Sequence, residues 1–255
     1  MGTRWVLGIL LIASLEMIYG SWSPAITAEA DELEETGRLL AVLLDAGRVA
    51  IGHNQPLLND PLRGDKGFTP DVFAQQMLAV FKDRTGHDLT DLARASVPEM
   101  AKPLLARLVE ESKKTVASYQ SVINVAGIKY KGLIPATFGT ETSNRFHAWS
   151  RVYLKQTAPD HLIRNPKNKP DEFEASIMQK MSDPSFPRGN EQVVTEVDAD
   201  GKSVRVLLPL FYGKDCLSCH GTPKGERDVT GYPREGAKEG ELGGAISVKI
   251  PRPSR

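Results

Sequence analysis

The chain has 255 residues, enough for one large domain or two small ones and for a core that encloses a cofactor. Its 32 basic and 32 acidic residues cancel, which argues against nucleic acid or an anionic membrane surface as the main partner. Two cysteines are too few for a framework of several disulfides.

The first residues have the pattern of an export signal. Arg4 supplies a positive charge, Trp5–Leu15 is an apolar run, and Ala28–Ala30 offers a cleavage site of the A-x-A type. The run is shorter than the roughly 20 residues of a membrane-spanning helix, which makes an uncleaved anchor the weaker alternative. We therefore expect a signal peptide over residues 1–30 and a single periplasmic domain over residues 31–255.

Residues 31–155 are predicted to be mainly helical. Apolar residues at helical spacing predict an amphipathic helix over Asp31–Val49, extending toward Gln55. A second helix is predicted over Asp71–Arg84, with Thr69 or Asp71 as its N-cap.

The helical part contains an internal repeat. A shift of 65 positions aligns the second half of this part with the first without a gap, including glycine, proline and phenylalanine residues. This indicates a duplicated helix–loop–helix unit; the alternative is two long helices that share ordinary core spacing. The matched pairs include Gln55 and Gln120, Asn59 and Asn124, Lys66 and Lys131, Gly67 and Gly132, and Pro70 and Pro135.

Residues 156–255 are predicted to be mainly β. Thr157–Pro170 is rich in proline and asparagine and is expected to be an ordered loop. Asp171 then begins a short helix, and Glu174 is its capping-box partner. The inner face of this helix is predicted to consist of Phe173, Ile177, Met178 and Met181.

Strand signals follow this helix. Gln192–Val197 and Ser203–Leu208 are rich in valine and leucine and flank Asp200-Gly201, a hairpin turn pair. Gly243–Ile250 is predicted to be a final strand of the same sheet. Helices followed by strands predict an α+β fold.

The motif with the clearest chemistry is Cys216-Leu217-Ser218-Cys219-His220. A C-x-x-C-H run is typical of c-type haem attachment. Each thiol adds across one vinyl group of the porphyrin and forms a thioether, and His220 supplies the proximal nitrogen to the iron. The sequence therefore predicts one covalent haem c.

Three other interpretations of the two cysteines are weaker. A thioredoxin-like pair needs a nearby βαβ pattern, which is not visible. A structural zinc site needs two more Cys or His ligands at close spacing, and the nearest other histidine in the sequence is His161. A disulfide between Cys216 and Cys219 would close a very short loop and would gain little from loop entropy.

Several stretches together resemble a bacterial family of single-haem c-type sensor domains with a PAS-like fold. They are Arg164–Glu174 (RNPKNKPDEFE), the CLSCHG run, Gly231-Tyr232-Pro233 and Gly243–Ser247 (GGAIS). Such domains occur alone as exported proteins or in front of chemoreceptors and histidine kinases. The resemblance covers Leu33–Pro251 and implies a PAS-like antiparallel sheet that carries the haem, with long helices alongside.

The resemblance leaves the sixth iron ligand open. Some relatives use an upstream cysteine, and this chain has no cysteine besides Cys216 and Cys219. His147 and His161 lie closest to the matching motifs and are the first candidates, and an open or water-filled position is an equal alternative. The other candidates are His53, His87, Met77, Met100, Met178 and Met181, although Met178 and Met181 suit core packing better.

Other residues near the matching motifs are candidates for contact with the haem. Arg164, Asn165 and Asn168 suit haem propionates, since guanidinium forks bind carboxylates; the alternative is a solvated Arg164 and a turn whose asparagines bond their own backbone. Tyr212 and Tyr232 flank the motif and are candidates for packing on the porphyrin.

We therefore expect a periplasmic monohaem protein, and not an enzyme, that senses redox state or a small diatomic gas. The alternative is a soluble electron carrier; a small haem peroxidase is the weakest interpretation, because no paired distal His and Arg motif is recognisable. The expected partners are a redox protein or a membrane-bound signalling protein, with no nucleic acid, and a homodimer is a further expectation. The chain does not continue into a kinase after Arg255, so sensing would need a separate partner protein.

Overall fold

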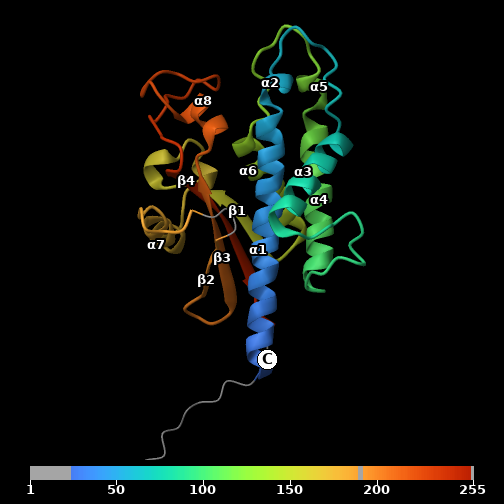
Figure 1. The fold of residues 1–255 in the computed structure, drawn as a ribbon, viewed down its shortest axis with the longest axis vertical. Helices are drawn as coiled ribbons and strands as arrows, with labels where there is room; N and C mark the ends of the chain where they lie inside the picture. Colours follow the sequence, from blue (N-terminus) through green and yellow to red (C-terminus); the bar gives the residue numbers. More distant parts are fainter. Residues whose placement is uncertain (1–23, 189–191, 254–255) are drawn as a thin grey trace, which may run out of the picture.

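The structure is a computed structural model that describes residues 24–188 and 192–253. A helical unit is followed by a four-stranded antiparallel sheet, so the predicted α+β class is confirmed (Figure 1). The predicted signal peptide falls largely on residues 1–23, outside the described residues, and stays a prediction. None of the described helices has the length and apolar character needed to cross a membrane.

The helical unit contains two copies of the same succession of helices. The predicted cap is confirmed, because the Thr69 hydroxyl accepts a hydrogen bond from the Val72 amide at 3.2 Å. The first copy is α1 (Pro24–His53), α2 (Gln55–Leu58) and α3 (Pro70–Thr85); the second is α4 (Ala101–Ser118), α5 (Gln120–Ile123) and α6 (Pro135–Trp149). From α2 onward, corresponding helices begin 65 residues apart, which confirms the predicted repeat.

The two copies are joined by reciprocal hydrogen bonds between equivalent residues. The backbone amide of Lys66 donates to Oδ1 of Asn124 at 3.0 Å, and that of Lys131 donates to Oδ1 of Asn59 at 3.1 Å. The side-chain amides of a second pair do the same with carbonyl groups at 2.9 Å: Gln55 Nε2 donates to Leu133 O, and Gln120 Nε2 donates to Phe68 O. The copies are therefore related by an approximate two-fold axis.

The sheet has the strand order β1-β4-β3-β2. Three of the strands were predicted, and β3 is longer than expected because it continues to Phe211. The first strand, β1, was missed: it lies between α6 and the proline-rich loop and pairs with β4. The strands are β1 (Tyr153–Thr157), β2 (Val194–Val197), β3 (Ser203–Phe211) and β4 (Leu242–Pro251).

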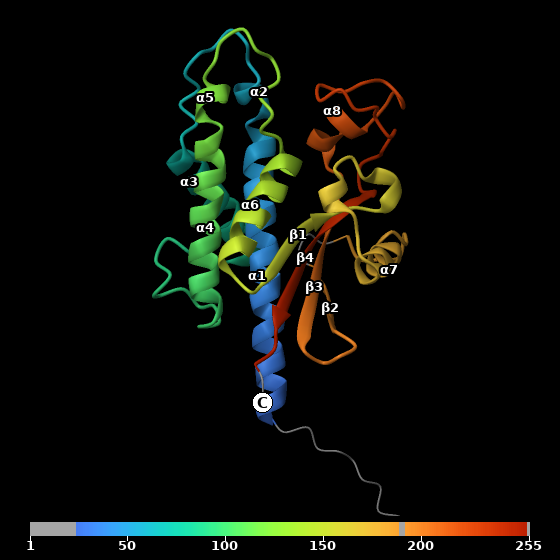
Figure 2. The ribbon, with the colours of Figure 1, turned by 180° about the vertical axis from the view of Figure 1, so that it is seen from behind.

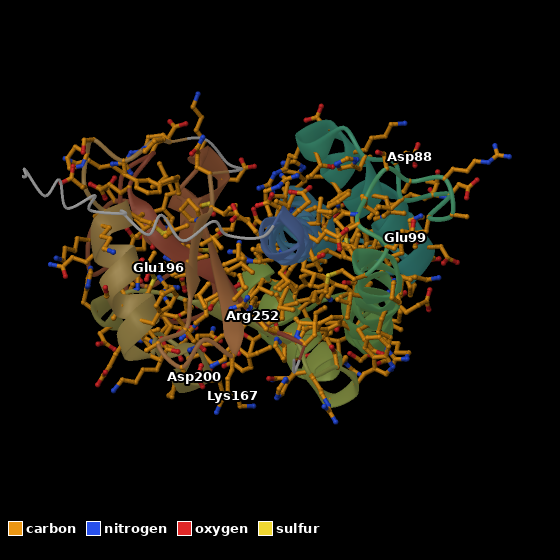
Figure 3. The ribbon with its side chains drawn as sticks, turned by 90° about the horizontal axis from the view of Figure 1, so that it is seen from below. Asp88, Glu99, Lys167, Glu196, Asp200 and Arg252 are labelled. Atoms are coloured by element: carbon orange, nitrogen blue, oxygen red, sulfur yellow. The ribbon has the colours of Figure 1, made fainter. Side chains whose placement is uncertain are left out.

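The two faces of the sheet are covered differently. Helices α1 and α6 pack on one face, and α7 (Glu172–Met181) packs on part of the other; the view from below (Figure 3) shows the strands between α1 and α7. Gly37 allows α1 to approach closely, since a Cβ atom there would lie 2.6 Å from Cγ2 of Val206. The main apolar core lies between α1, the other long helices and this face of the sheet.

Helix α7 confirms the predicted capping box. The Asp171 carboxylate accepts from the Glu174 amide at 2.8 Å, and the Glu174 carboxylate accepts from the Asp171 amide at 2.9 Å. Met178 and Met181 are buried in the small core between α7 and the sheet, so core packing, the preferred interpretation of these methionines, is confirmed. The PAS-like character of the sheet stays a prediction.

Candidate functional site

The CLSCH segment (residues 216–220) follows directly from the longest contact between two strands. Strand β3 pairs with β4 up to Phe211, and the chain then turns through η3 (Lys214–Cys216) into α8 (Leu217–His220). Figure 2 shows α8 beyond the end of the sheet, across from the upper part of the helical unit. The sheet therefore presents this segment on a short helix at one end of the molecule.

Both thiols of the segment are unbridged. Cys216 is exposed and Cys219 is half-buried on the same short turn. Burial raises the pKa of the Cys219 thiol, against the effect of the Ser218 hydroxyl, which lies 3.8 Å from its sulfur. Two free thiols, one of them at the surface, fit covalent attachment to a porphyrin edge.

The His220 imidazole is held through one nitrogen. Its Nδ1 lies 2.9 Å from Oε2 of Glu235 and 3.5 Å from the Tyr212 hydroxyl, and the Tyr212 and His220 rings pack with centroids 4.9 Å apart. Within the described part of the chain, Nε2 has no hydrogen-bond partner. A carboxylate on Nδ1 fixes the tautomer that leaves Nε2 free to bind a metal, so His220 fits a proximal iron ligand.

Arg164 clamps the segment from the loop between β1 and α7. Its guanidinium donates to both oxygens of Glu235 at 2.8 and 3.0 Å, to Asp228 at 2.6 Å and to the backbone carbonyl of Cys219 at 3.0 Å. The Tyr232 ring lies beneath it at 5.4 Å and its hydroxyl donates to the Arg164 carbonyl at 3.1 Å. A planar donor fork of this kind holds several acceptors in one geometry.

Burial, together with the Arg164 charge, favours the neutral form of His220. Burial lowers the pKa of His220, the Arg164 charge lowers it further, and Glu235 opposes both. Burial alone would raise the pKa of Glu235 and of Asp228, but hydrogen bonds from Arg164 to both and from Thr230 to Asp228 hold both pKa values below their ordinary ranges. The imidazole is therefore ready to act as a neutral metal ligand beside two ionised carboxylates.

The structure gives Arg164 and the asparagines partners other than those expected. Arg164 is neither solvated nor free for propionates, because carboxylates and a carbonyl occupy its fork. Asn165 is exposed and caps its own short turn, η2 (Pro166–Asn168). Asn168 is buried between α6 and β1, bonded to Thr140 and Thr157 at 2.9 Å. Propionate binding by these residues stays a prediction that their contacts do not support.

The candidates for the sixth iron ligand lie in different parts of the molecule. Nε2 of His53, at the end of α1, lies 3.9 Å from Oδ2 of Asp215, next to Cys216. His147 is exposed on α6 and packs edge-on against Tyr153, and His161 is exposed in η1 (Asp160–Leu162). Among the described contacts, none joins His147 or His161 to the CLSCH segment, whereas His53 contacts Asp215, the residue that precedes it. Met77 and Met100 belong to the helical core.

Three contributors to the site were missed from the sequence. Glu235 and Asp228 lie in the glycine-rich loop after the motif, where no spacing links them to Arg164. Tyr130 belongs to the helical unit: burial raises its pKa, and the charges of Asp228 and Cys219 raise it further. Within the described residues, no group of three or more His, Cys, Asp or Glu side chains that could hold a bare metal ion is present.

Two comparisons with known proteins gave a match. Residues 31–251 match the family model described as Tll0287-like. The crystal structure of the cyanobacterial heme-protein Tll0287 is similar to this chain with a TM-score of 0.42 and 16% sequence identity, over 63% of this chain and 99% of that one. A search of curated proteins found no match.

Proposed function

The chain belongs to the Tll0287-like family, and on this premise we propose that it is a monohaem c-type protein of the periplasm that senses redox state or a small diatomic gas. The observation that carries the proposal is the geometry of the CLSCH segment: two unbridged thiols, and an imidazole whose Nδ1 is held by Glu235 while Nε2 has no partner among the described residues. The printed description of Tll0287 as a heme-protein supports it.

The residues of the site have distinct roles in this proposal. Cys216 and Cys219 form the thioethers, and His220 binds the iron through Nε2. Glu235 and Arg164 orient the imidazole, and the buried Tyr212 ring restricts water on one side of it. When bound, the haem supplies an iron that exchanges one electron and, with an open sixth position, binds a diatomic gas.

The alternative is a soluble electron carrier, and one observation favours it. Cys216 is exposed, so an attached porphyrin edge would lie at the surface, within reach of a redox partner. A reduced protein that binds carbon monoxide or nitric oxide would support the sensor, and a haem that stays six-coordinate without binding either gas would support the carrier. Turnover of peroxide would contradict the proposal that the protein is not an enzyme.

The attachment is tested in a host that matures c-type cytochromes. We expect the wild-type chain to stain for haem on a denaturing gel and to fractionate with the periplasm. Cys216→Ala and Cys219→Ala should each weaken the stain, and the double variant should abolish it, because no thioether remains. Normal staining of the double variant would refute covalent attachment through these residues. His220→Ala should keep the stain but change the absorption spectrum.

A further inference from the structure

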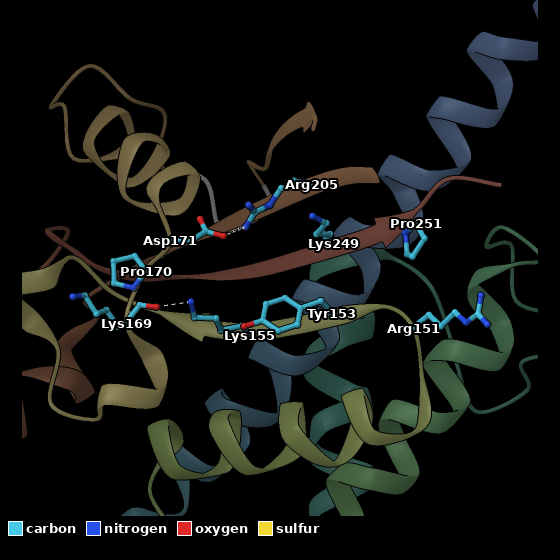
Figure 4. Close-up of a pocket in the computed structure, with 9 residues that line it drawn as sticks. All are labelled: Arg151, Tyr153, Lys155, Lys169, Pro170, Asp171, Arg205, Lys249 and Pro251. Carbon is cyan, nitrogen blue, oxygen red and sulfur yellow. Dashed lines mark hydrogen bonds and ion pairs between the residues drawn. The ribbon is translucent and has the colours of Figure 1, made fainter. Parts of the chain in front are cut away.

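A cleft with a volume of about 510 Å³ lies on the face of the sheet that points away from α1. Helix α7 covers the part of this face around Leu207 and Ala245. The cleft occupies the neighbouring part, over β1, β3 and β4, with the turn before α7 as one wall (Figure 4). Its volume falls in the range of roughly 300–1,000 Å³ that is usual for small-molecule sites.

The lining of the cleft is strongly cationic, although the whole chain has no net charge. One carboxylate, Asp171, lines it. The five cationic residues that line it are Arg151, Lys155, Lys169, Arg205 and Lys249. A concave surface with one sign of charge concentrates ligands of the opposite sign.

Three of the five cations are fixed by carboxylates. Arg205 pairs with Asp171 at 2.8 Å and with Glu174 at 3.4 Å, and Lys155 pairs with Glu174 at 2.7 Å. Lys249 pairs with Asp198 at 2.5 Å. The three carboxylates balance three of the five positive charges. The two positive charges that remain are those of Arg151 and Lys169.

Arg151 and Lys169 are available to a ligand. Both are exposed, and within the described residues no ion pair engages either side chain. Figure 4 shows them at opposite ends of the cleft, with the Tyr153 ring on its floor between them. Two separate anchors with an aromatic surface between them suit a ligand that carries an anionic group at each end.

Within the part of the chain that the structure describes, two buried polar atoms of the same face have no hydrogen-bond partner. Arg205 is only 6% exposed, yet its Nε has no hydrogen-bond partner, although the side chain lines the cleft. The Ser247 hydroxyl is fully buried and also unpartnered; its register with Lys155 and Leu207 places it on this face. Buried donors without acceptors are uncommon in native proteins. Of these two residues, Arg205 belongs to the lining of the cleft, so its guanidinium is the group that a ligand oxygen at this wall would approach.

We propose that this cleft binds a small organic acid with two carboxylates. One carboxylate is received at the Lys169 end, where Lys155 is also present, and the other at the Arg151 end, beside Lys249. Tyr153 packs against the carbon chain between them. This site lies on a different part of the sheet from the CLSCH segment, and its occupation does not depend on the proposed haem.

The proposal is tested by calorimetric titration of succinate into the full mature protein, with acetate and inorganic phosphate as comparison ligands. We expect succinate to bind at least about tenfold more tightly than acetate, because acetate reaches one anchor only. The double variant Arg151→Gln and Lys169→Gln should lose at least about tenfold in succinate affinity. The matched control, Arg94→Gln and Lys129→Gln, removes two exposed cations of the helical unit and should bind like wild type.

Several outcomes would overturn the proposal. Equal succinate affinity in the double variant and the matched control would exclude the cleft as the binding site. Phosphate binding as tight as that of succinate would exclude selectivity for a dicarboxylate. Tighter binding of a poly-glutamate peptide through the same two residues would indicate a protein partner instead. A shift of the thermal unfolding midpoint by succinate, measured on both variants, checks the result independently. Calorimetry reads binding without reference to haem, so failure here is separate from failure of the haem proposal.

Discussion

At the scale of single residues, Glu235 is the side chain through which the CLSCH segment and the Arg164 clamp are connected. It lies 2.9 Å from Nδ1 of His220 and accepts two hydrogen bonds from Arg164. A carboxylate on the far nitrogen of an imidazole ligand raises the basicity of the nitrogen that binds the metal. Glu235 is therefore placed to tune an iron that it does not touch.

Glu235→Gln is expected to raise the reduction potential of the matured protein by tens of millivolts, because a neutral partner donates less electron density through His220. A spectroelectrochemical titration measures the potential. Glu239→Gln changes an exposed carboxylate in the same loop and serves as the matched control. An identical potential in both variants would show that Glu235 has only a structural role.

The Asp228 carboxylate links stability to pH. Hydrogen bonds from Thr230 and Arg164 outweigh the effect of burial and hold its pKa below the usual value near 3.9. Its stabilising contribution is therefore complete above that value and is lost as pH falls through the lower, folded pKa. At neutral pH, the free energy of unfolding of Asp228→Asn should be about 1–2 kcal/mol lower than that of wild type. The difference between the two proteins should become smaller below about pH 4. Urea unfolding at a series of pH values measures it; a gap of constant size would contradict this assignment.

The position of His53 makes it the first histidine to test as the sixth ligand. Its side chain lies against Asp215, next to Cys216, whereas His147 lies on α6 against Tyr153. We expect His53→Ala to change the absorption and electron paramagnetic resonance spectra of the oxidised protein, and His147→Ala to leave both as in wild type. Unchanged spectra for His53→Ala would favour an open or water-filled sixth position.

At the scale of elements, the two copies of the helical unit depend on each other. In each copy a loop joins the short helix (α2 or α5) to the next long helix (α3 or α6). An asparagine and a glutamine side chain from one copy hydrogen-bond to the loop of the other copy. Each loop also buries a lysine whose Nζ donates to backbone carbonyls of the same loop. Lys66 and Lys131 are both 2% exposed. Carbonyl groups that would otherwise be orphaned in these turns are thereby satisfied.

Equivalent substitutions in the two copies should have similar effects, with the larger loss at Asn59, whose Nδ2 also donates to Oε1 of Gln55 at 3.0 Å. Asn59→Ala and Asn124→Ala each leave one buried backbone amide without its acceptor, which costs about 1–3 kcal/mol. The free energy of unfolding from urea titration measures both. Asn144→Ala, on the exposed face of α6, is the control and should change it by less than about 0.5 kcal/mol. Strongly unequal losses at positions 59 and 124 would show that the copies are not energetically equivalent.

The features that were predicted depend on neighbouring residues in the sequence, and the features that were missed depend on contacts between distant residues. Three features depend only on residues that are close together in the sequence, and these were predicted. They are the N-cap at Thr69, the capping box at Asp171 and the turn at Gly201 (φ 70°). Strand β1 is only five residues long and pairs with β4, some ninety residues later, so its state depends on a distant partner. Arg164 meets Asp228 and Glu235 across 64 and 71 residues, and no local pattern marks such contacts.

At the scale of the whole molecule, α1 joins the helical unit to the sheet. It packs on β3 and β4 with one side and on α3, α4 and α6 with the others, and its end reaches η3. It approaches the sheet closely at Gly37, against Val206 and Ile250. The helical unit and the sheet therefore share one core.

Gly37→Val should destabilise both parts together by about 1–3 kcal/mol, because its side chain would collide with Val206. Circular dichroism of the helices and haem absorption should report the same shifted urea midpoint. Gly52→Ala is the control, since a Cβ there meets only Pro135 at an ordinary 3.6 Å. Separate midpoints for the two signals would show that the parts unfold independently.

The exchanged asparagine and glutamine bonds have a consequence for the origin of the chain. A single copy of the helix–loop–helix unit contains both the donors and the acceptors of these hydrogen bonds, but its own donors do not bond to its own acceptors. Such a unit would complete its bonds by pairing with an identical molecule across a two-fold axis. Fusion of two such self-complementary protomers into one polypeptide would give the arrangement seen here, in which the second copy supplies α6 against β1 of the sheet.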